Sequence, residues 1–192
     1  MLWSHFKNFN CVSPIIYSPI AFPISSPLPP TKKHPRLYLG LLAGLVAITA
    51  NTLVLKAAPL LAVNAESGGL LKLVLLHTKL WLPAGLLTVV QTEGFKLLFH
   101  YLTGLGMVGL YVLVFEPRLP SNGWAKGGLF LLLPWAINGF VVLPLLGLGV
   151  LGTRVLTAGG ILYFCGANAV FGLVLGGVYV YLRQWQKSAE VV

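Results

Sequence analysis

The sequence predicts an all-α membrane protein with four transmembrane helices. Of its 192 residues, 57% are hydrophobic and only 9% are charged, and the mean hydropathy is +0.86. A soluble domain carries about a quarter charged residues, because its surface must face water. Four long uncharged stretches follow Arg36, each close to the ~20 residues that cross a bilayer core of ~30 Å. Lipid is therefore the expected solvent of most of the chain.

The charge balance points to the lipid bilayer as a partner. Thirteen Lys and Arg residues against four acidic residues give a formal net charge of +9, and the sequence contains no Asp. Nucleic-acid-binding proteins cluster their basic residues on one folded face. Here the basic residues flank the apolar stretches, as they do where charge orients helices in a membrane. We therefore expect no nucleic-acid partner.

Residues 1–36 form a separate, proline-rich segment. A proline recurs every few residues in Ser13–Pro30, which excludes a regular helix because proline lacks the backbone N–H and clashes with the preceding turn. The uninterrupted apolar stretch of a signal peptide is missing. We predict a disordered leader or upstream sequence translated from a misassigned start, with a proline-rich docking segment as the alternative.

Residues 37–183 form the predicted four-helix membrane domain, and residues 184–192 form a short tail. The apolar run from Leu37 to Leu55 is the first helix, and the run from Leu97 to Phe115, extended backwards, is the second. Two further uncharged runs are long enough to cross a bilayer with some tilt. The expected spans are residues 37–57, 94–115, 127–149 and 156–182.

The apolar segment at residues 68–90 is predicted to lie in the membrane interface. Two lysines, Lys72 and Lys79, interrupt it together with His77 and Pro83. A lysine at the centre of a transmembrane helix costs about 2.5–3.5 kcal/mol. Lys72 and Lys79 are seven residues apart and share a helical face, which suits a helix lying between helices 1 and 2 with both amines in water. A re-entrant segment and a fifth span are the alternatives.

The distribution of basic residues predicts the orientation. Seven of them fall on one side of a four-helix arrangement: Lys32, Lys33, Arg36, Arg118, Lys126, Arg183 and Lys187. Five fall on the other side: Lys56, Lys72, Lys79, Lys96 and Arg154. Short cytoplasmic loops carry the excess of Lys and Arg. We expect a multi-pass protein of the cytoplasmic (inner) membrane with both termini in the cytoplasm.

An internal repeat relates the second predicted helix to the fourth. A shift of 68 residues, without a gap, aligns His100 with Asn168, Gly104 with Gly172, Leu105 with Leu173, Gly109 with Gly177, Tyr111 with Tyr179 and Val112 with Val180. The first and third helices match more loosely, and each carries a central asparagine, Asn51 or Asn138. The chain is therefore predicted to contain two related helical hairpins that enter the membrane in the same direction.

Glycines are predicted to form the contacts between these helices. Water does not drive association inside a membrane, so helices pack where small residues allow close backbone approach. The candidates are Gly40, Gly44, Gly104, Gly109, Gly172, Gly176 and Gly177. Packing within one chain is the preferred interpretation, and self-association through a remaining glycine face is the alternative.

These motifs resemble a domain-of-unknown-function family of small bacterial four-helix membrane proteins. The residues that carry the resemblance are Gly40–Leu60, His100–Gly104, Pro144–Gly152, Asn168–Gly172 and Gly176–Tyr179. Some members are labelled sodium:proline symporters, although such symporters are several times larger. The resemblance covers about residues 37–182 and implies fold and topology but no chemistry. A histidine often begins both glycine motifs in that family, whereas the second motif here begins with Asn168.

Four polar side chains lie within the predicted spans: Asn51, His100, Asn138 and Asn168. All four fall at mid-depth or towards the outer half. An unpaired amide in hydrocarbon costs several kcal/mol, so these groups should face other helices and bond one another or backbone carbonyls. The preferred interpretation is a polar clasp that fixes helix register, each bond contributing about 0.6–2 kcal/mol. The alternative is a polar cavity for a small solute, an ion or a lipid head group.

No cofactor, metal site or catalytic residue is predicted. A transmembrane haem commonly takes two axial histidines, and only His100 lies firmly within a span. The cysteines Cys11 and Cys165 form no metal-binding spacing. The acidic residues Glu66, Glu93 and Glu116 fall in loops or at helix ends rather than as a paired acid and base. Glu93 is expected to pair locally with Lys96, three residues later on the same helix.

The sequence therefore favours a structural or accessory membrane component that is not an enzyme. The alternative is a small homodimeric permease, or a membrane protein that binds a solute or lipid in a polar cavity near the outer half of the bilayer. Assembly as a homodimer or within a larger membrane complex is compatible with either function.

Overall fold

A computed structural model of the chain describes residues 33–65, 69–119 and 122–189. The elements of these residues are all helical, and no strand occurs among them. Most of the predicted leader, together with Cys11 and Glu66, lies outside the described residues. Residues 33–36, the last four of the predicted leader, are helical, because the first helix begins at Lys33.

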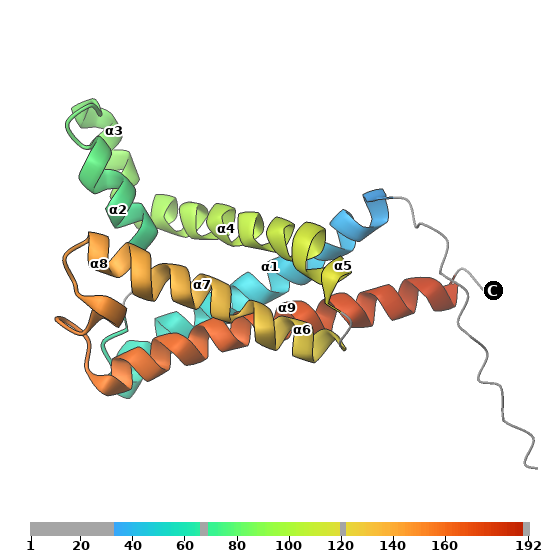
Figure 1. Ribbon diagram of the computed structural model, residues 1–192. Coiled ribbons are helices and arrows are strands. Elements are labelled where there is room, and N and C mark those ends of the chain that lie inside the picture. Colours follow the sequence, from blue (N-terminus) through green and yellow to red (C-terminus); the bar gives the residue numbers. More distant parts are fainter. Residues whose placement is uncertain (1–32, 66–68, 120–121, 190–192) are drawn as a thin grey trace, which may run out of the picture. The chain divides into compact units, whose positions relative to one another are not determined.

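The first two long helices are α1 (Lys33–Ala57) and α4 (Glu93–Leu110) (Figure 1). A short 3₁₀ turn, η1 (Ala58–Leu61), ends α1. Thr92 caps α4, since its hydroxyl oxygen accepts a hydrogen bond of 3.3 Å from the backbone N–H of Phe95. Beyond α4 the helix continues through a π-helical segment, η2 (Tyr111–Phe115), into α5 (Glu116–Arg118).

The third long helix is built from several pieces. It comprises α6 (Gly123–Phe130), α7 (Leu132–Ile137), the π-helical segment η3 (Asn138–Val142) and α8 (Leu143–Leu145). Each of two prolines, Pro134 and Pro144, removes a backbone donor from the helical hydrogen-bond ladder. The helix is accordingly irregular near the prolines, and the π-helical segment η3 lies between them. A 3₁₀ turn, η4 (Val150–Gly152), follows before α9 (Ala158–Ala189).

The four long helices confirm the predicted fold class at the level of an all-α chain with four membrane-spanning candidates. These helices are long and apolar enough to cross a membrane: Arg36–Leu61, Glu93–Arg118, Gly123–Leu145 and Ala158–Ala189. Many large apolar side chains on their surfaces are exposed, for example Leu53, Leu102 and Leu162. Exposed apolar surface of this kind suits contact with lipid rather than water.

Three of the predicted boundaries differ from the helix ends in the structure. The third helix starts at Gly123 instead of residue 127, because the side chain of Asn122 caps it with a 2.8 Å bond to the N–H of Ala125. It ends at Leu145 instead of residue 149, since Gly147 and Gly149 have φ angles of +77° and +82°. The fourth helix continues past residue 182 to Ala189, because no proline or glycine interrupts its polar end.

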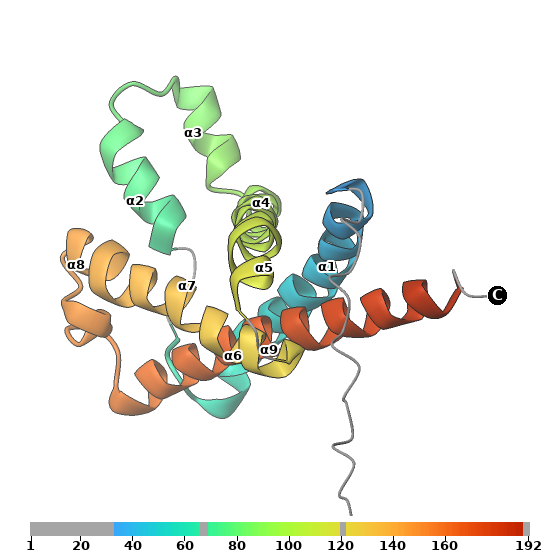
Figure 2. The same ribbon diagram turned by 45° about the vertical axis from the view of Figure 1, so that its right-hand side comes forward.

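The segment predicted to be interfacial forms two short helices, α2 (Gly69–Thr78) and α3 (Ala84–Val90). With 10 residues, α2 is only about 15 Å long and cannot cross a ~30 Å hydrocarbon core. Neither described helix of this segment is long enough to span the core by itself. The two helices form the α2–α3 hairpin, which follows η1 and leads into α4 (Figure 2).

Helix α1 packs against both α4 and α9, and α9 also packs against α6. The buried core contains Ala43, Ala47 and Ile48 from α1, which allow close approach of the neighbouring helices. Aromatic rings fill the core further along: the ring centroid of Tyr111 lies 5.2 Å from that of Phe130 and 6.0 Å from that of Tyr179. The long helices have a hairpin end, next to α2 and α8, and a terminal end, where α1 begins and α9 ends (Figure 1).

Six of the seven predicted packing glycines lie at helix contacts. Methyl groups on Gly40, Gly44 and Gly104 would meet Val112, Val108 and Ile48 at 2.5, 2.5 and 2.7 Å, respectively. Methyl groups on Gly172 and Gly176 would collide with backbone atoms of α6, and one on Gly177 would meet the Trp124 ring at 2.9 Å.

Gly109 is the exception among these glycines. A methyl group there would have no described atom within 4 Å. Gly109 follows Gly104 by five residues, which places it about 140° around the helix and away from α1. Gly109 therefore does not lie at a contact among the described helices.

Candidate ligand-binding cavity

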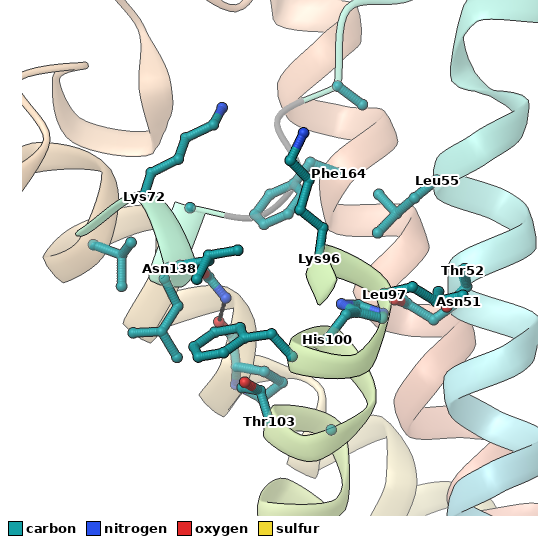
Figure 3. A pocket seen from close by; sticks show the side chains of 18 of the residues that line it. Asn51, Thr52, Leu55, Lys72, Lys96, Leu97, His100, Thr103, Asn138 and Phe164 are labelled. Atoms are coloured by element: carbon teal, nitrogen blue, oxygen red, sulfur yellow. Dashed lines mark hydrogen bonds between the residues drawn. The ribbon is translucent and has the colours of Figure 1, made fainter. Parts of the chain in front are cut away.

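A cavity of about 940 Å³ lies among the long helices on their hairpin side. Ligand sites of small molecules commonly measure about 300–1,000 Å³. The cavity is lined by residues from α1, α2, α4, α7, η3 and α9, and it is partly open. All four polar residues singled out from the sequence line it: Asn51, His100, Asn138 and Asn168 (Figure 3).

The cavity exists because the helices are packed unequally along their lengths. At the terminal end, the Phe130 ring of α6 meets the rings of Tyr111 and Phe115 of η2 edge to face, at centroid distances of 5.2 and 5.0 Å. Towards the hairpin end, α4 packs against α1, whereas α7 packs against α6 and α9. The cavity therefore lies between two walls, one formed by α4 and the other by α7 and η3. Aromatic rings close it on the side of the terminal end.

The polar residues lie at a similar level along their helices. Asn51 is six residues from the end of α1, so it lies about 9 Å from the hairpin end. His100 is seven residues from the start of α4, which gives about 10 Å. Asn168 is ten residues from the start of α9, or about 15 Å. These three side chains therefore lie within about 6 Å of one another along the helix axes, at one polar level of the cavity that Asn138 also lines.

The asparagines do not bond one another. Asn51 donates a 2.8 Å hydrogen bond from Nδ2 to the carbonyl oxygen of Ala167, which connects α1 to α9. Asn138 and Asn168 donate to carbonyl oxygens of their own helices, those of Pro134 at 2.9 Å and Phe164 at 2.8 Å. Only Asn51 therefore holds two helices together, whereas the other two amides line the cavity without linking its walls.

His100 lies across the cavity from Asn138. It comes from α4 with Leu97 and Thr103, while Asn138 comes from η3 on the opposite wall (Figure 3). The His100 ring is half-buried and meets the Tyr101 ring edge to face, with centroids 6.4 Å apart. Its ring nitrogens form no hydrogen bond with the described part of the chain, so they can donate to or accept from a bound molecule.

Three lysines add positive charge at the hairpin end of the cavity. Lys56 of α1, Lys72 of α2 and Lys96 of α4 all contribute to its lining, together with Glu93. Figure 3 places the ammonium groups of Lys72 and Lys96 on the same side of the cavity, above the polar level. The predicted pair between Lys96 and Glu93 is confirmed, with a 2.7 Å contact. Among the described lining residues, the formal charges of these three lysines and Glu93 sum to +2.

The lysines were not predicted as parts of this site. From the sequence, Lys72 is an obstacle to membrane insertion and Lys96 is half of a local ion pair. The available signal was the spacing on single helices, since Lys96 precedes His100 by four residues and so lies on the same helical face. The position of Lys72 depends on how α2 folds back over η3, which no local spacing indicates.

A second cluster of charge closes the terminal end. Glu116 is only 4% exposed, and its Oε1 lies 2.5 Å from Nη1 of Arg183 and 3.6 Å from Nζ of Lys126. Lys126 Nζ also donates a 2.6 Å bond to the Glu116 carbonyl oxygen. The sequence indicated a helix end at Glu116, but the structure makes it the centre of a contact among α5, α6 and α9.

Other chemistry-bearing residues are dispersed. Cys165 is a free thiol of intermediate exposure on α9. Within residues 33–65, 69–119 and 122–189, no three His, Cys, Asp or Glu side chains are close enough together to hold a metal ion. Comparison with protein-family models, with curated proteins and with solved structures yields no match.

Proposed function

We propose that this chain is a multi-pass membrane protein that binds a small polar or amphiphilic molecule in the cavity between α4 and α7. The observation that carries the proposal is the convergence of Asn51, His100, Asn138 and Asn168 on one cavity of about 940 Å³. Binding without catalysis is the activity proposed, with no resident cofactor or metal.

A ligand site accounts for the polar residues better than a clasp does. A clasp requires side chains that hold helices together, and only Asn51 forms such a bond. Asn138 and Asn168 satisfy one amide hydrogen each on their own helices, and His100 faces the opposite wall. Buried polar groups in an apolar cavity usually supply orientation and specificity to a bound molecule. These three residues are therefore the proposed ligand contacts.

Replacing the asparagines by leucine tests this function. Asn138→Leu and Asn168→Leu remove cavity polarity but no bond between helices, so each variant should stay folded and lose the bound molecule. Asn51→Leu is the matched control, because it removes the α1–α9 bond and should lower thermal stability. Native mass spectrometry in mild detergent measures the co-purified mass, and a thermal melt measures folding. Undiminished bound mass in the Asn138→Leu/Asn168→Leu double variant would refute the binding function.

The proposed orientation places the cavity in the outer half of the bilayer. Both termini would then face the cytoplasm of a bacterial inner membrane. Arg118, Lys126 and Arg183 lie at the terminal end, close to the short connection between α5 and α6. An excess of basic residues in short loops marks the cytoplasmic side, which supports this assignment. The resemblance to small bacterial four-helix proteins is in accord with it.

The α2–α3 hairpin is proposed to lie at the membrane–water interface on the outer side of the inner membrane. Leu80 and Trp81, between the two short helices, are 88% and 86% exposed. Tryptophan is enriched where hydrocarbon meets the head groups, because its ring is apolar and its N–H is polar. Lys79 stands beside these residues and is also exposed. An apolar tip next to an exposed cation suits a position in the interface.

Repeated glycine contacts support the proposal of two related hairpins. Gly40 packs on Val112 in the first, and Gly123 packs on Val180 in the second. The 68-residue shift relates Val112 to Val180. In this proposal α1 corresponds to α6–α8 and α4 to α9. Under this correspondence, the close packing of α1 on α9 would be matched by packing of α7 on α4. Instead of such packing, the cavity lies between α7 and α4.

An accessory role is the second candidate, and the free face of α4 favours it. Gly106 and Gly109 are open to their surroundings, and Leu102 and Leu113 beside them are exposed. Small residues on a lipid-facing helix allow the close approach of another helix. A homodimer or a larger membrane complex could form there, and a homodimer would supply the further helices that a permease path requires. Gly109→Leu should abolish such a dimer, measured as native mass in detergent.

A further inference from the structure

The cavity has a graded lining that runs from charged to polar to apolar. On α1 the lining residues Lys56, Asn51 and Ile48 follow one another from the hairpin end inwards. Lys56 lies five residues beyond Asn51, and Ile48 lies three residues before it. With a rise of 1.5 Å per residue, these steps correspond to about 7.5 Å and 4.5 Å along the helix axis.

Helix α4 repeats the same order on another wall. Lys96, His100 and Met107 line the cavity in that sequence from the hairpin end. Lys96 precedes His100 by about 6 Å along the axis, and Met107 follows it by about 10 Å. On α9, Asn168 is followed by Phe171, which closes the inner part of the cavity. Helices α1 and α4 therefore place charged, polar and apolar lining residues in the same order from the hairpin end, and α9 repeats the polar and apolar steps.

We infer that the ligand of this cavity is an anionic single-chain amphiphile, with its acidic head group among the lysines and its chain towards Met107 and Phe171. This inference rests on the proposed binding function and adds the chemical class of the ligand. The polar level would hold the linker between head and chain, for example the hydroxyl and ester of a glycerol unit. His100 and Asn138 supply donors and acceptors there from opposite walls.

Charge and volume both select this class. Among the described lining residues, the three lysines and Glu93 sum to a formal charge of +2, so an anion gains Coulomb energy there that a zwitterion does not. The volume of about 940 Å³ suits one apolar chain with its head group rather than an isolated inorganic anion. A phosphate ion alone would also leave the apolar inner part unfilled.

The test compares four probes on detergent-solubilised full-length protein. Lysophosphatidylglycerol and lysophosphatidylcholine with the same acyl chain differ only in head group, palmitate supplies a carboxylate, and inorganic phosphate lacks a chain. Native mass titration gives the dissociation constants. We expect lysophosphatidylglycerol to bind about tenfold more tightly than lysophosphatidylcholine, palmitate to compete with it, and excess inorganic phosphate not to displace it.

Matched lysine variants locate the charge effect. Lys56→Gln/Lys72→Gln should weaken lysophosphatidylglycerol binding about tenfold and leave lysophosphatidylcholine binding unchanged. Lys79→Gln removes the same charge from the same hairpin but does not line the cavity, so it should change binding less than about twofold. The substituted lysines are exposed, and an unchanged thermal midpoint verifies folding.

Three outcomes would overturn the inference. Equal affinity for the two lysolipids, with binding still lost in Asn138→Leu/Asn168→Leu, would leave the binding function intact but exclude anion selectivity. Equal weakening by Lys79→Gln would assign the effect to general surface charge. Displacement by inorganic phosphate would assign the site to a free anion instead of an amphiphile.

Discussion

Glu116 and Arg183 are 67 positions apart in the sequence, yet the carboxylate of one lies 2.5 Å from the guanidinium of the other. The Glu116 side chain is 5% exposed, and the Arg183 side chain is 27% exposed. Because Lys126 lies 3.6 Å from the same carboxylate oxygen, one buried anion connects α5, α6 and α9. This contact closes the terminal end of the bundle, opposite the cavity.

Glu116→Gln should destabilise the protein markedly. Removing one partner of a buried pair costs about 3–5 kcal/mol, because the remaining charge stays desolvated. Partial exposure of Arg183 lowers the expected loss to roughly 2–3 kcal/mol. Glu93→Gln is the control, since the Glu93 side chain is 90% exposed and a solvent-exposed ion pair contributes little to stability. Thermal unfolding in detergent compares the two, and equal midpoints would contradict the structural role of Glu116.

Gly127→Ala should disrupt the contact of α6 with α9. A methyl group at Gly127 would collide with the backbone carbonyl oxygen of Gly172, which cannot move like a side chain. Overpacking of this kind costs about 1–3 kcal/mol. Gly109→Ala meets open space and should be neutral or stabilising by about 0.5–1 kcal/mol, because alanine favours the helix. Thermal midpoints in the opposite order would show that the helix contact is wrongly placed.

Tyr111→Phe and Tyr179→Phe should raise stability. Both hydroxyl oxygens are buried and have no hydrogen-bond partner in the part of the chain that the structure describes. An unsatisfied buried hydroxyl costs about 1–3 kcal/mol, which phenylalanine avoids while keeping the ring contacts. The thermal midpoint should therefore increase in each variant. A clear decrease would indicate that water or a ligand group bonds these hydroxyls.

The proposed orientation predicts the accessibility of two single cysteines. In a chain with Cys11 and Cys165 replaced by serine, Lys79→Cys should react with a membrane-impermeant maleimide added outside intact cells. Ser188→Cys, near the end of α9, should react only after the membrane is permeabilised. Both positions are exposed, so unequal burial does not explain a difference. The reverse pattern would show that the termini face outwards.

Local features of the sequence determined the fold class and much of the helix count. Four long uncharged runs predicted four spanning helices, since crossing hydrocarbon requires length and apolarity within one segment. The pair of Glu93 and Lys96 was predictable because residues three apart on a helix are neighbours. Helix ends were less predictable, since the Asn122 cap and the positive φ angles of Gly147 and Gly149 depend on the conformation of single residues.

Only part of the candidate site was predictable from the sequence. Asn51, His100, Asn138 and Asn168 were identifiable because polar groups in apolar runs are costly. Whether they form a clasp or line a cavity depends on the separation of α4 from α7, and no single helix encodes that distance. Lys72 joined the site through the folding of α2 against η3, where a methyl group added to Gly69 would lie 3.3 Å from the Val142 side chain.

Hydrophobicity, charge and residue spacing along the chain thus determined which segments are helical and which side chains are expensive to bury. Tertiary structure alone decided the partner of Glu116, the exclusion of Gly109 from the helix contacts and the open space beside His100. The physical reason is that burial cost belongs to a residue and its immediate segment, whereas a contact or a cavity belongs to two helices whose relative placement results from packing along their whole lengths.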